Sequence, residues 1–97
     1  MRSRASIELI PAIRAMLREL DVDASSTAEA SGRRAALWRA QQQAARLDAT
    51  LEDVRRYCLG VLTPDRLLVE DDYLRGFRES LEEVLLAISA LETRGSR

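Results

Sequence analysis

The chain has 97 residues, of which 46% are hydrophobic and 4% aromatic, and its formal net charge is −1 at pH 7. This length predicts one domain, 1–97, with a modest core of Leu, Ala, Val and Ile that gains stability from a partner or from self-association. Residues 1–47 carry eight Arg against five acidic residues, and residues 48–97 carry seven against eleven, so the halves have net charges of +3 and −4. This asymmetry favours contacts with another copy and argues against a generic DNA-coating protein, which is basic throughout.

The residue types that usually carry catalysis are scarce. The chain has no His, which removes the usual general base near neutral pH and the commonest zinc ligand. Its one cysteine, Cys58, falls on an apolar stripe and is expected to be a buried thiol instead of a nucleophile or a metal ligand. We therefore expect no enzyme, no cofactor, no metal site and no small-molecule substrate.

The amino-terminal residues do not form a hydrophobic signal core, and no apolar run reaches the roughly 18 residues of a membrane span. We therefore expect no membrane contact. The expected location is the cytoplasm, or an assembly made there.

A first helix is predicted over about residues 10–21, because four apolar residues share one face: Ile10, Ile13, Leu17 and Leu20. Pro11 is compatible with the first turn of a helix and not with its interior, so the helix is expected to begin near it. In the polar link that follows, Ser26 and Glu29 have the spacing of a capping box and predict the start of a second helix. Gly32 lies in the first turns of that helix and is expected to let this end bend or fray.

The second helix is predicted over about residues 27–60 as one continuous helix. Its apolar residues keep a three-four spacing along a stripe formed by Leu37, Ala40, Ala44, Leu47, Leu51, Val54, Cys58 and Val61. The alternative is a break near Asp48, with Thr50 as the cap of a new helix. We favour the continuous helix because a break normally shifts the phase of a stripe, and because no Gly or Pro intervenes before Gly60. Gly60 and Thr63-Pro64 then end the helix.

A third helix is predicted over about residues 71–93, with a second apolar stripe formed by Leu74, Phe77, Leu81, Val84, Ile88 and Leu91. Glu70, Asp71 and Asp72 place negative charge at its amino end, where the helix dipole favours it. Consecutive carboxylates point around a helix start and do not converge, so we expect a capping role for them instead of a metal site.

The two stripes predict an all-α fold, in which a long antiparallel, coiled-coil-like helical hairpin is joined to a short N-terminal helix. The hairpin folds about residues 65–67. The neighbours it predicts are Cys58 and Leu74, Leu51 and Leu81, Ala44 and Ile88, and Ala40 and Leu91.

The apolar face of the first helix is a candidate protein-interaction surface, formed by Ile10, Ile13, Leu17 and Leu20. The part of the second helix within its reach offers mainly Ala side chains, interrupted by Arg33 and Arg34, so this face is under-matched. Burial of each such side chain is worth roughly 1.5–3 kcal/mol, so a second copy or another protein is expected to cover the face. Trp38, one position off the stripe, either flanks the core or anchors the same interface.

Two charged groups are candidate electrostatic contacts. Arg33, Arg34 and Arg39 surround Trp38 and have the chemistry to stack on bases or pair with phosphate, but we favour a solvated or intersubunit face. The acidic group consists of Glu70, Asp71 and Asp72. We expect a protein partner or a homo-oligomer before nucleic acid.

Residues 72–85 read DYLRGFRESLEEVL: an aromatic residue, a Gly three positions later, a second aromatic residue, then Leu and Val-Leu. This segment resembles parts of small all-helical proteins encoded by tailed bacteriophages of high-GC hosts. The resemblance implies a virion component, an assembly factor or an inhibitor of a host protein, with a location in the virion if the chain is phage-encoded.

The expected function is that of a non-enzymatic helical interaction protein. Such a protein self-associates or docks on a larger protein assembly, as a structural or adaptor component of a phage does. The alternative is a regulatory binding module, such as an inhibitor of a host protein or a nucleic-acid-associated factor.

Overall fold

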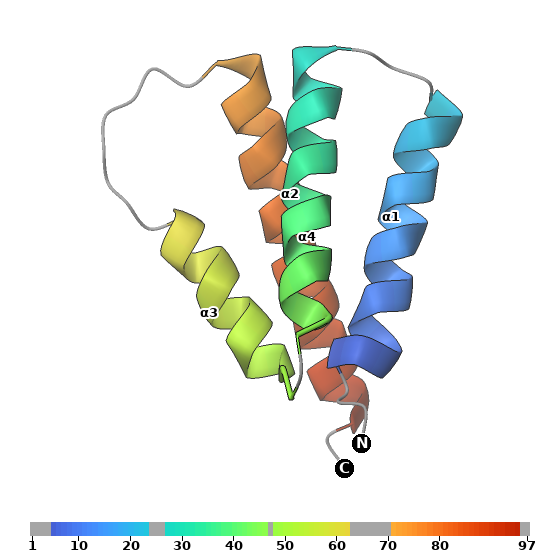
Figure 1. Ribbon diagram of the computed structural model, residues 1–97, viewed down its shortest axis with the longest axis vertical. Helices are drawn as coiled ribbons and strands as arrows, with labels where there is room; N and C mark the ends of the chain where they lie inside the picture. The colour runs from blue at the N-terminus through green and yellow to red at the C-terminus, as the bar shows by residue number, and fades with distance from the viewer. Residues whose placement is uncertain (1–4, 24–26, 47, 63–70, 96–97) are drawn as a thin grey trace.

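The computed structural model describes residues 5–23, 27–46, 48–62 and 71–95 (Figure 1). A π-helical segment, η1 (Ala5–Leu9), leads directly into α1 (Ile10–Asp23), and three further helices follow: α2 (Ala28–Ala44), α3 (Leu51–Leu62) and α4 (Asp72–Gly95). Every regular element in these ranges is helical, so the predicted all-α class is confirmed. None of the described helices combines the length and the apolar character needed to cross a membrane.

The N-terminal half of α2 forms where the sequence predicted it, but it is capped differently. Thr27 has extended backbone geometry, and its hydroxyl accepts a hydrogen bond of 3.1 Å from the Ala30 N–H. Ser26, the predicted cap, lies outside the described residues. The helix is continuous through Gly32, which is buried, so the prediction that this end bends or frays is wrong.

The predicted continuous helix over residues 27–60 is wrong, because α2 ends at Ala44 and α3 begins at Leu51. Asp48, between them, has a φ of 62°, in the left-handed region that ends helices and that Asp tolerates better than most residues. The Asp53 carboxylate accepts from the Thr50 N–H at 2.9 Å, while the Thr50 hydroxyl accepts from the Asp53 N–H at 3.0 Å. This reciprocal capping restarts the chain as α3, as the alternative with Thr50 as cap described.

The main packing partner of α2 is α4, and these two helices run in the same direction (Figure 1). Glu29 lies beside Gly76, and four residues later Arg33 binds Glu79 and Glu83, so residue numbers rise together along the pair. α1 and α3 run in the opposite direction to both. The structure therefore does not contain the predicted long antiparallel hairpin: α2 and α4 lie parallel, and only the shorter α3 is antiparallel to α4.

The parallel pair crosses backbone against backbone at two glycines. A Cβ atom on Gly32 would lie 2.0 Å from the Tyr73 carbonyl oxygen, and one on Gly76 would lie 2.1 Å from the Glu29 carbonyl oxygen. Small residues continue this face of α2 every fourth position, all of them buried: Gly32, Ala36, Ala40 and Ala44. Such a stripe allows two helices to approach closely enough for Cα–H···O contacts between their backbones.

The core confirms most of the predicted stripe positions. The buried members are Leu37, Ala40, Ala44, Leu51, Val54, Cys58, Leu81, Val84, Ile88 and Leu91, together with Leu9, Ile10 and Ile13 from the N-terminal segment. Val61 and Leu74, at the ends of the stripes, are each 39% exposed, and Leu47 lies outside the described residues. Arg55 joins α3 to α4 by pairing with Glu92 as well as with Glu52 of its own helix.

Candidate functional site

The apolar face of the first helix is largely used inside the molecule. Ile10 and Ile13 are buried in the core, so their predicted role in an intermolecular surface is wrong. The cover comes from η1, which extends the helix before Pro11 and packs on α2, α3 and α4, a contact that the sequence prediction did not include. Leu17 and Leu20 are half-buried against the core.

Trp38 lies on the solvent side of α2, with 52% of the residue exposed. It points away from α4, because Ala36 and Ala40, two positions to either side, are buried against the core. A hollow of about 510 Å³ lies between α2 and α3, lined by Ala35, Trp38, Arg39, Gln42, Gln43 and Tyr57. We call this hollow the Trp38 groove.

The Trp38 groove is basic and aromatic. The Arg39 guanidinium lies 5.9 Å from the centre of the Phe77 ring, and no carboxylate of the described residues lies within ion-pair distance of it. Phe77 in turn stacks on Tyr73, with ring centres 6.4 Å apart. These contacts place a cation, with no carboxylate partner in the described ranges, over an aromatic surface beside Trp38.

A second hollow, of about 460 Å³, continues the groove toward the α2–α3 connection, lined by Gln43, Arg46, Ala49, Asp53, Arg56 and Tyr57. Arg46 Nη1 donates to Gln43 Oε1 at 3.2 Å, and Arg56 pairs with Glu52 at 3.6 Å. Since Tyr57 and Gln43 line both hollows, the two form one surface with an aromatic centre and Arg side chains along it.

Arg33 and Arg34 do not belong to this surface. Arg33 reaches across to α4, where Nη2 donates to Glu79 at 2.7 Å and Nη1 to Glu83 at 3.1 Å, and Nε lies 3.7 Å from Glu29. Burial works to lower the pKa of Arg33, but the hydrogen bond and charge of Glu83 and the charges of Glu79 and Glu29 outweigh it and raise the pKa. This guanidinium holds α2 to α4, with its charge shared among three carboxylates. Arg34 is half-buried and has a partner of its own.

The two described residues of the acidic run lie at the start of α4. The Asp71 carboxylate accepts from the Leu74 N–H at 2.8 Å, and the Asp72 carboxylate pairs with Arg75 at 2.8 Å. Both carboxylates therefore serve the helix itself. Glu70 lies outside the described residues.

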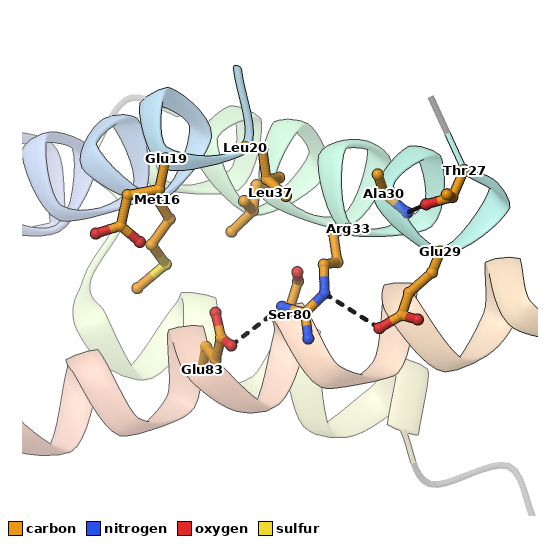
Figure 2. Close-up of a pocket in the computed structure, with 10 residues that line it drawn as sticks. All are labelled: Met16, Glu19, Leu20, Thr27, Glu29, Ala30, Arg33, Leu37, Ser80 and Glu83. Atoms are coloured by element: carbon orange, nitrogen blue, oxygen red, sulfur yellow. Dashed lines mark hydrogen bonds and ion pairs between the residues drawn. The ribbon is translucent and has the colours of Figure 1, made fainter. Parts of the chain in front are cut away.

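A separate cleft of about 470 Å³ opens between α1, α2 and α4, and Figure 2 shows the side chains around it. Its lining residues are Met16, Glu19, Leu20, Thr27, Glu29, Ala30, Arg33, Leu37, Ser80 and Glu83. Ser80 is buried, and its hydroxyl has no hydrogen-bond partner among the described residues. A buried hydroxyl without a partner costs about 1–3 kcal/mol, so this one needs an explanation. We call this cleft between α1, α2 and α4 the α1 cleft.

Comparison with known protein families, with curated proteins and with solved structures gives no match. The resemblance of residues 72–85 to phage proteins therefore stays a prediction. The two hollowed surfaces and their chemistry are the features of the molecule that bear on its function.

Proposed function

We propose that the protein is a non-enzymatic interaction module that docks on another protein through the Trp38 groove. The observation that supports this most is the exposure of Trp38 beside Tyr57 and Arg39, a cation with no carboxylate partner among the described residues. Trp, Tyr and Arg are the residues most enriched among those that dominate binding energy, and here the three line one hollow. An exposed Trp on a surface without such neighbours would carry less weight.

The chemistry of the groove defines the partner as an acidic segment with an apolar anchor. A Leu or aromatic side chain fits against Trp38 and Tyr57, while an Asp or Glu on the same segment pairs with Arg39. Gln42 and Gln43 supply amide groups for the partner's backbone or polar side chains. The resemblance of residues 72–85 to phage-encoded proteins suggests a virion or host protein as the source of such a segment.

Single-stranded nucleic acid is the second candidate, because Arg39, Arg46 and Arg56 lie along the same surface as Trp38 and Tyr57. Aromatic rings can stack on bases while Arg side chains pair with phosphates. The carboxylates of Glu52 and Asp53 beside Arg56 repel a phosphate backbone, which carries a charge at every nucleotide, more than a peptide segment with one or two acidic residues, so they favour the protein partner.

Peptide selection tests the proposal and does not require the natural partner to be identified. A random peptide library is selected on the immobilised protein, and enriched peptides are then titrated against the wild type, W38A, R39E and L86A. Leu86 of α4 is 70% exposed and does not line the groove, so L86A is the matched control for loss of a large exposed apolar side chain. We expect enriched peptides to combine Asp or Glu with a Leu or aromatic residue.

We expect W38A and R39E each to weaken peptide binding about tenfold or more, and L86A to change it less than about twofold. Peptides that bind W38A as well as the wild type would contradict the proposal. Tight, salt-sensitive binding of an oligothymidine that quenches Trp38 fluorescence would instead assign the groove to nucleic acid. Light scattering that finds an oligomer dispersed by W38A would assign it to a second copy.

A further inference from the structure

We propose that the α1 cleft binds a small organic cation, namely a primary ammonium group on a short aliphatic body. This site lies on a different face of α2 from the Trp38 groove: Ala30, Arg33 and Leu37 line the cleft, whereas Ala35, Trp38 and Gln42 line the groove. At 100° per residue these two sets point in nearly opposite directions. The inference is therefore independent of the proposed docking function.

The cleft arises because α1 does not close onto α4. Within the N-terminal segment, α1 packs on α2, and η1, before it, contacts α4. Met16 and Leu20 of α1 are consequently only half-buried, and with Leu37 and Ala30 of α2 they form apolar walls. A volume of about 470 Å³ is in the range of small-molecule sites, which run from roughly 300 to 1,000 Å³. These walls suit an aliphatic chain.

The polar side chains of the cleft select for positive charge. Three carboxylates line it, from Glu19, Glu29 and Glu83, against one guanidinium, that of Arg33. Glu29 and Glu83 already pair with Arg33, but Glu19 has no ion pair with any described residue. Figure 2 shows Glu19 on α1 and Glu83 on α4 at the same end of the cleft, with Met16 between them. An ammonium placed there gains two carboxylates and remains next to the apolar wall.

Ser80 provides an observation independent of the charges. Ser80 lines the cleft, and its hydroxyl is buried and has no hydrogen-bond partner in the described part of the chain. A serine hydroxyl in a helix can bond back to the carbonyl of its own preceding turn, yet this one does not. It can accept a hydrogen bond from an ammonium N–H, so a ligand of this kind would give the orphan hydroxyl the partner that the described residues do not supply.

The test uses n-hexylammonium as the probe, with hexanol and hexanoate as matched compounds of the same chain length. Each is titrated into isotope-labelled full-length protein, and chemical shifts of the backbone amides and of the Met methyl groups are followed by NMR. We expect saturable shifts at Met16, Glu19 and Ser80 with hexylammonium, binding at least about fivefold weaker with hexanol, and no saturation with hexanoate.

Variants separate the proposed site from general charge attraction. E19Q and S80A are each expected to weaken hexylammonium binding about threefold or more, because each removes one group that receives the ammonium. E82Q is the control, since Glu82 is exposed on α4, pairs with Arg78 and does not line the cleft. Thermal unfolding of each variant verifies that the fold is kept.

Equal affinity for hexylammonium and hexanol, or equal weakening by E19Q and E82Q, would overturn the proposal. So would shifts that do not saturate, or that map to residues outside the cleft. None of these results affects the Trp38 groove, whose test uses peptides and a different set of variants.

Discussion

The Tyr73 carbonyl oxygen lies 2.0 Å from the point where a Cβ atom on Gly32 would stand. Real Cβ atoms essentially never come that close to backbone, so α2 and α4 can keep their contact only while residue 32 is glycine. Gly76 makes the same contact in the other direction, against the Glu29 carbonyl. The mutual glycine contact fixes both the distance between the helices and the position at which they cross.

We expect G32A to lower the free energy of unfolding by about 2 kcal/mol or more. The added methyl group favours the isolated helix by about 1 kcal/mol, but the clash is with backbone, so the two helices have to separate along their packed length. Urea unfolding followed by circular dichroism measures the difference.

G60A is the matched control for this substitution. Apart from Gly60 itself and its neighbours along the helix, no described residue has an atom within 4 Å of the position of a Cβ on Gly60, and its φ is not positive, so Ala is expected to raise the free energy of unfolding by about 0.5–1 kcal/mol. A G32A variant as stable as G60A would show that the helices are not held at backbone contact.

We expect R33M to lower the free energy of unfolding by about 1–2 kcal/mol at low ionic strength. Arg33 joins Glu29 of α2 to Glu79 and Glu83 of α4, and its removal leaves Glu83 without this partner and Arg75 as the cation near Glu29 and Glu79. Because this is a charge effect at a partly exposed site, the loss should shrink in 1 M salt. Urea unfolding at two salt concentrations measures it.

R56M is the corresponding control. Arg56 is exposed and makes one ion pair of 3.6 Å with Glu52, so its loss is expected to change the free energy of unfolding by less than about 0.5 kcal/mol. A destabilisation by R33M that equals that of R56M, or that persists unchanged in high salt, would count against the central role of Arg33.

We expect T50A to lower the free energy of unfolding by about 1 kcal/mol, because the hydroxyl that caps the Asp53 N–H is lost. T93A is the control: the Thr93 hydroxyl donates to the Ser89 carbonyl within α4, and its loss should cost less than about 0.5 kcal/mol. Equal losses would mean that Thr50 does not define the start of α3.

The same capping interaction predicts an acid dependence. The Thr50 N–H, and then the Thr50 hydroxyl, lower the pKa of Asp53 below its ordinary value of 3.8. A lowered pKa means that Asp53 contributes stability above pH 3.8 and that this contribution is lost as the pH falls through the lower folded value. D53N should therefore show a smaller loss of stability below pH 4 than the wild type, and identical acid profiles of the two proteins would refute this assignment.

We expect the stability of the wild type to decline relative to C58V as the pH rises from 9 toward 11. Burial raises the pKa of the Cys58 thiol from 9.0 to about 11. A raised folded pKa means that the contribution of the neutral thiol is complete below pH 9 and is lost through about pH 11, because the unfolded chain releases the proton first. The difference amounts to about 2–3 kcal/mol when complete. Urea unfolding at pH 7, 9 and 10.5 measures it, and stabilities that stay parallel would contradict a buried thiol.

The periodicity of the apolar residues identified the core of this protein, but it gave no sign of the break in the second predicted helix. Ala44 and Leu51, the buried residues on either side of the break, are seven positions apart, which is also the spacing of two helical turns. The apolar stripe therefore has the same spacing whether or not the helix is interrupted. The signals for the break were local, namely the capping pair of Thr50 and Asp53, and Asp48. These signals, and not the apolar stripe, indicated the correct helix boundary.

The apolar stripes also did not determine whether two helices pack parallel or antiparallel. An apolar stripe fits a parallel partner as well as an antiparallel one, and the expected short turn at residues 65–67 favoured the hairpin. In the sequence, Gly32 and Gly76 stand in separate predicted helices, and no pattern links them. The structure shows that both serve the close crossing of α2 and α4.

The candidate sites divide in the same way. Trp38 could be singled out from its type and its position off the stripe, and Arg39 from its neighbourhood. Tyr57 and Ser80 could not be singled out from the sequence. Tyr57 lies near Trp38 only because the chain breaks before α3, and Ser80 lines the α1 cleft only because α1 packs on α2 and does not close onto α4.

The parallel contact between α2 and α4 also bears on how the chain reaches its fold. The partners at the crossing, Gly32 and Tyr73, are separated by about forty residues, and α3 lies between them in the sequence. Contacts of such long range are formed late and slow the search for the native state, in contrast to an antiparallel hairpin that closes from its turn outward. During synthesis the small-residue stripe of α2 is made before α4, its packing partner, so we expect the core to assemble only once α4 has left the ribosome.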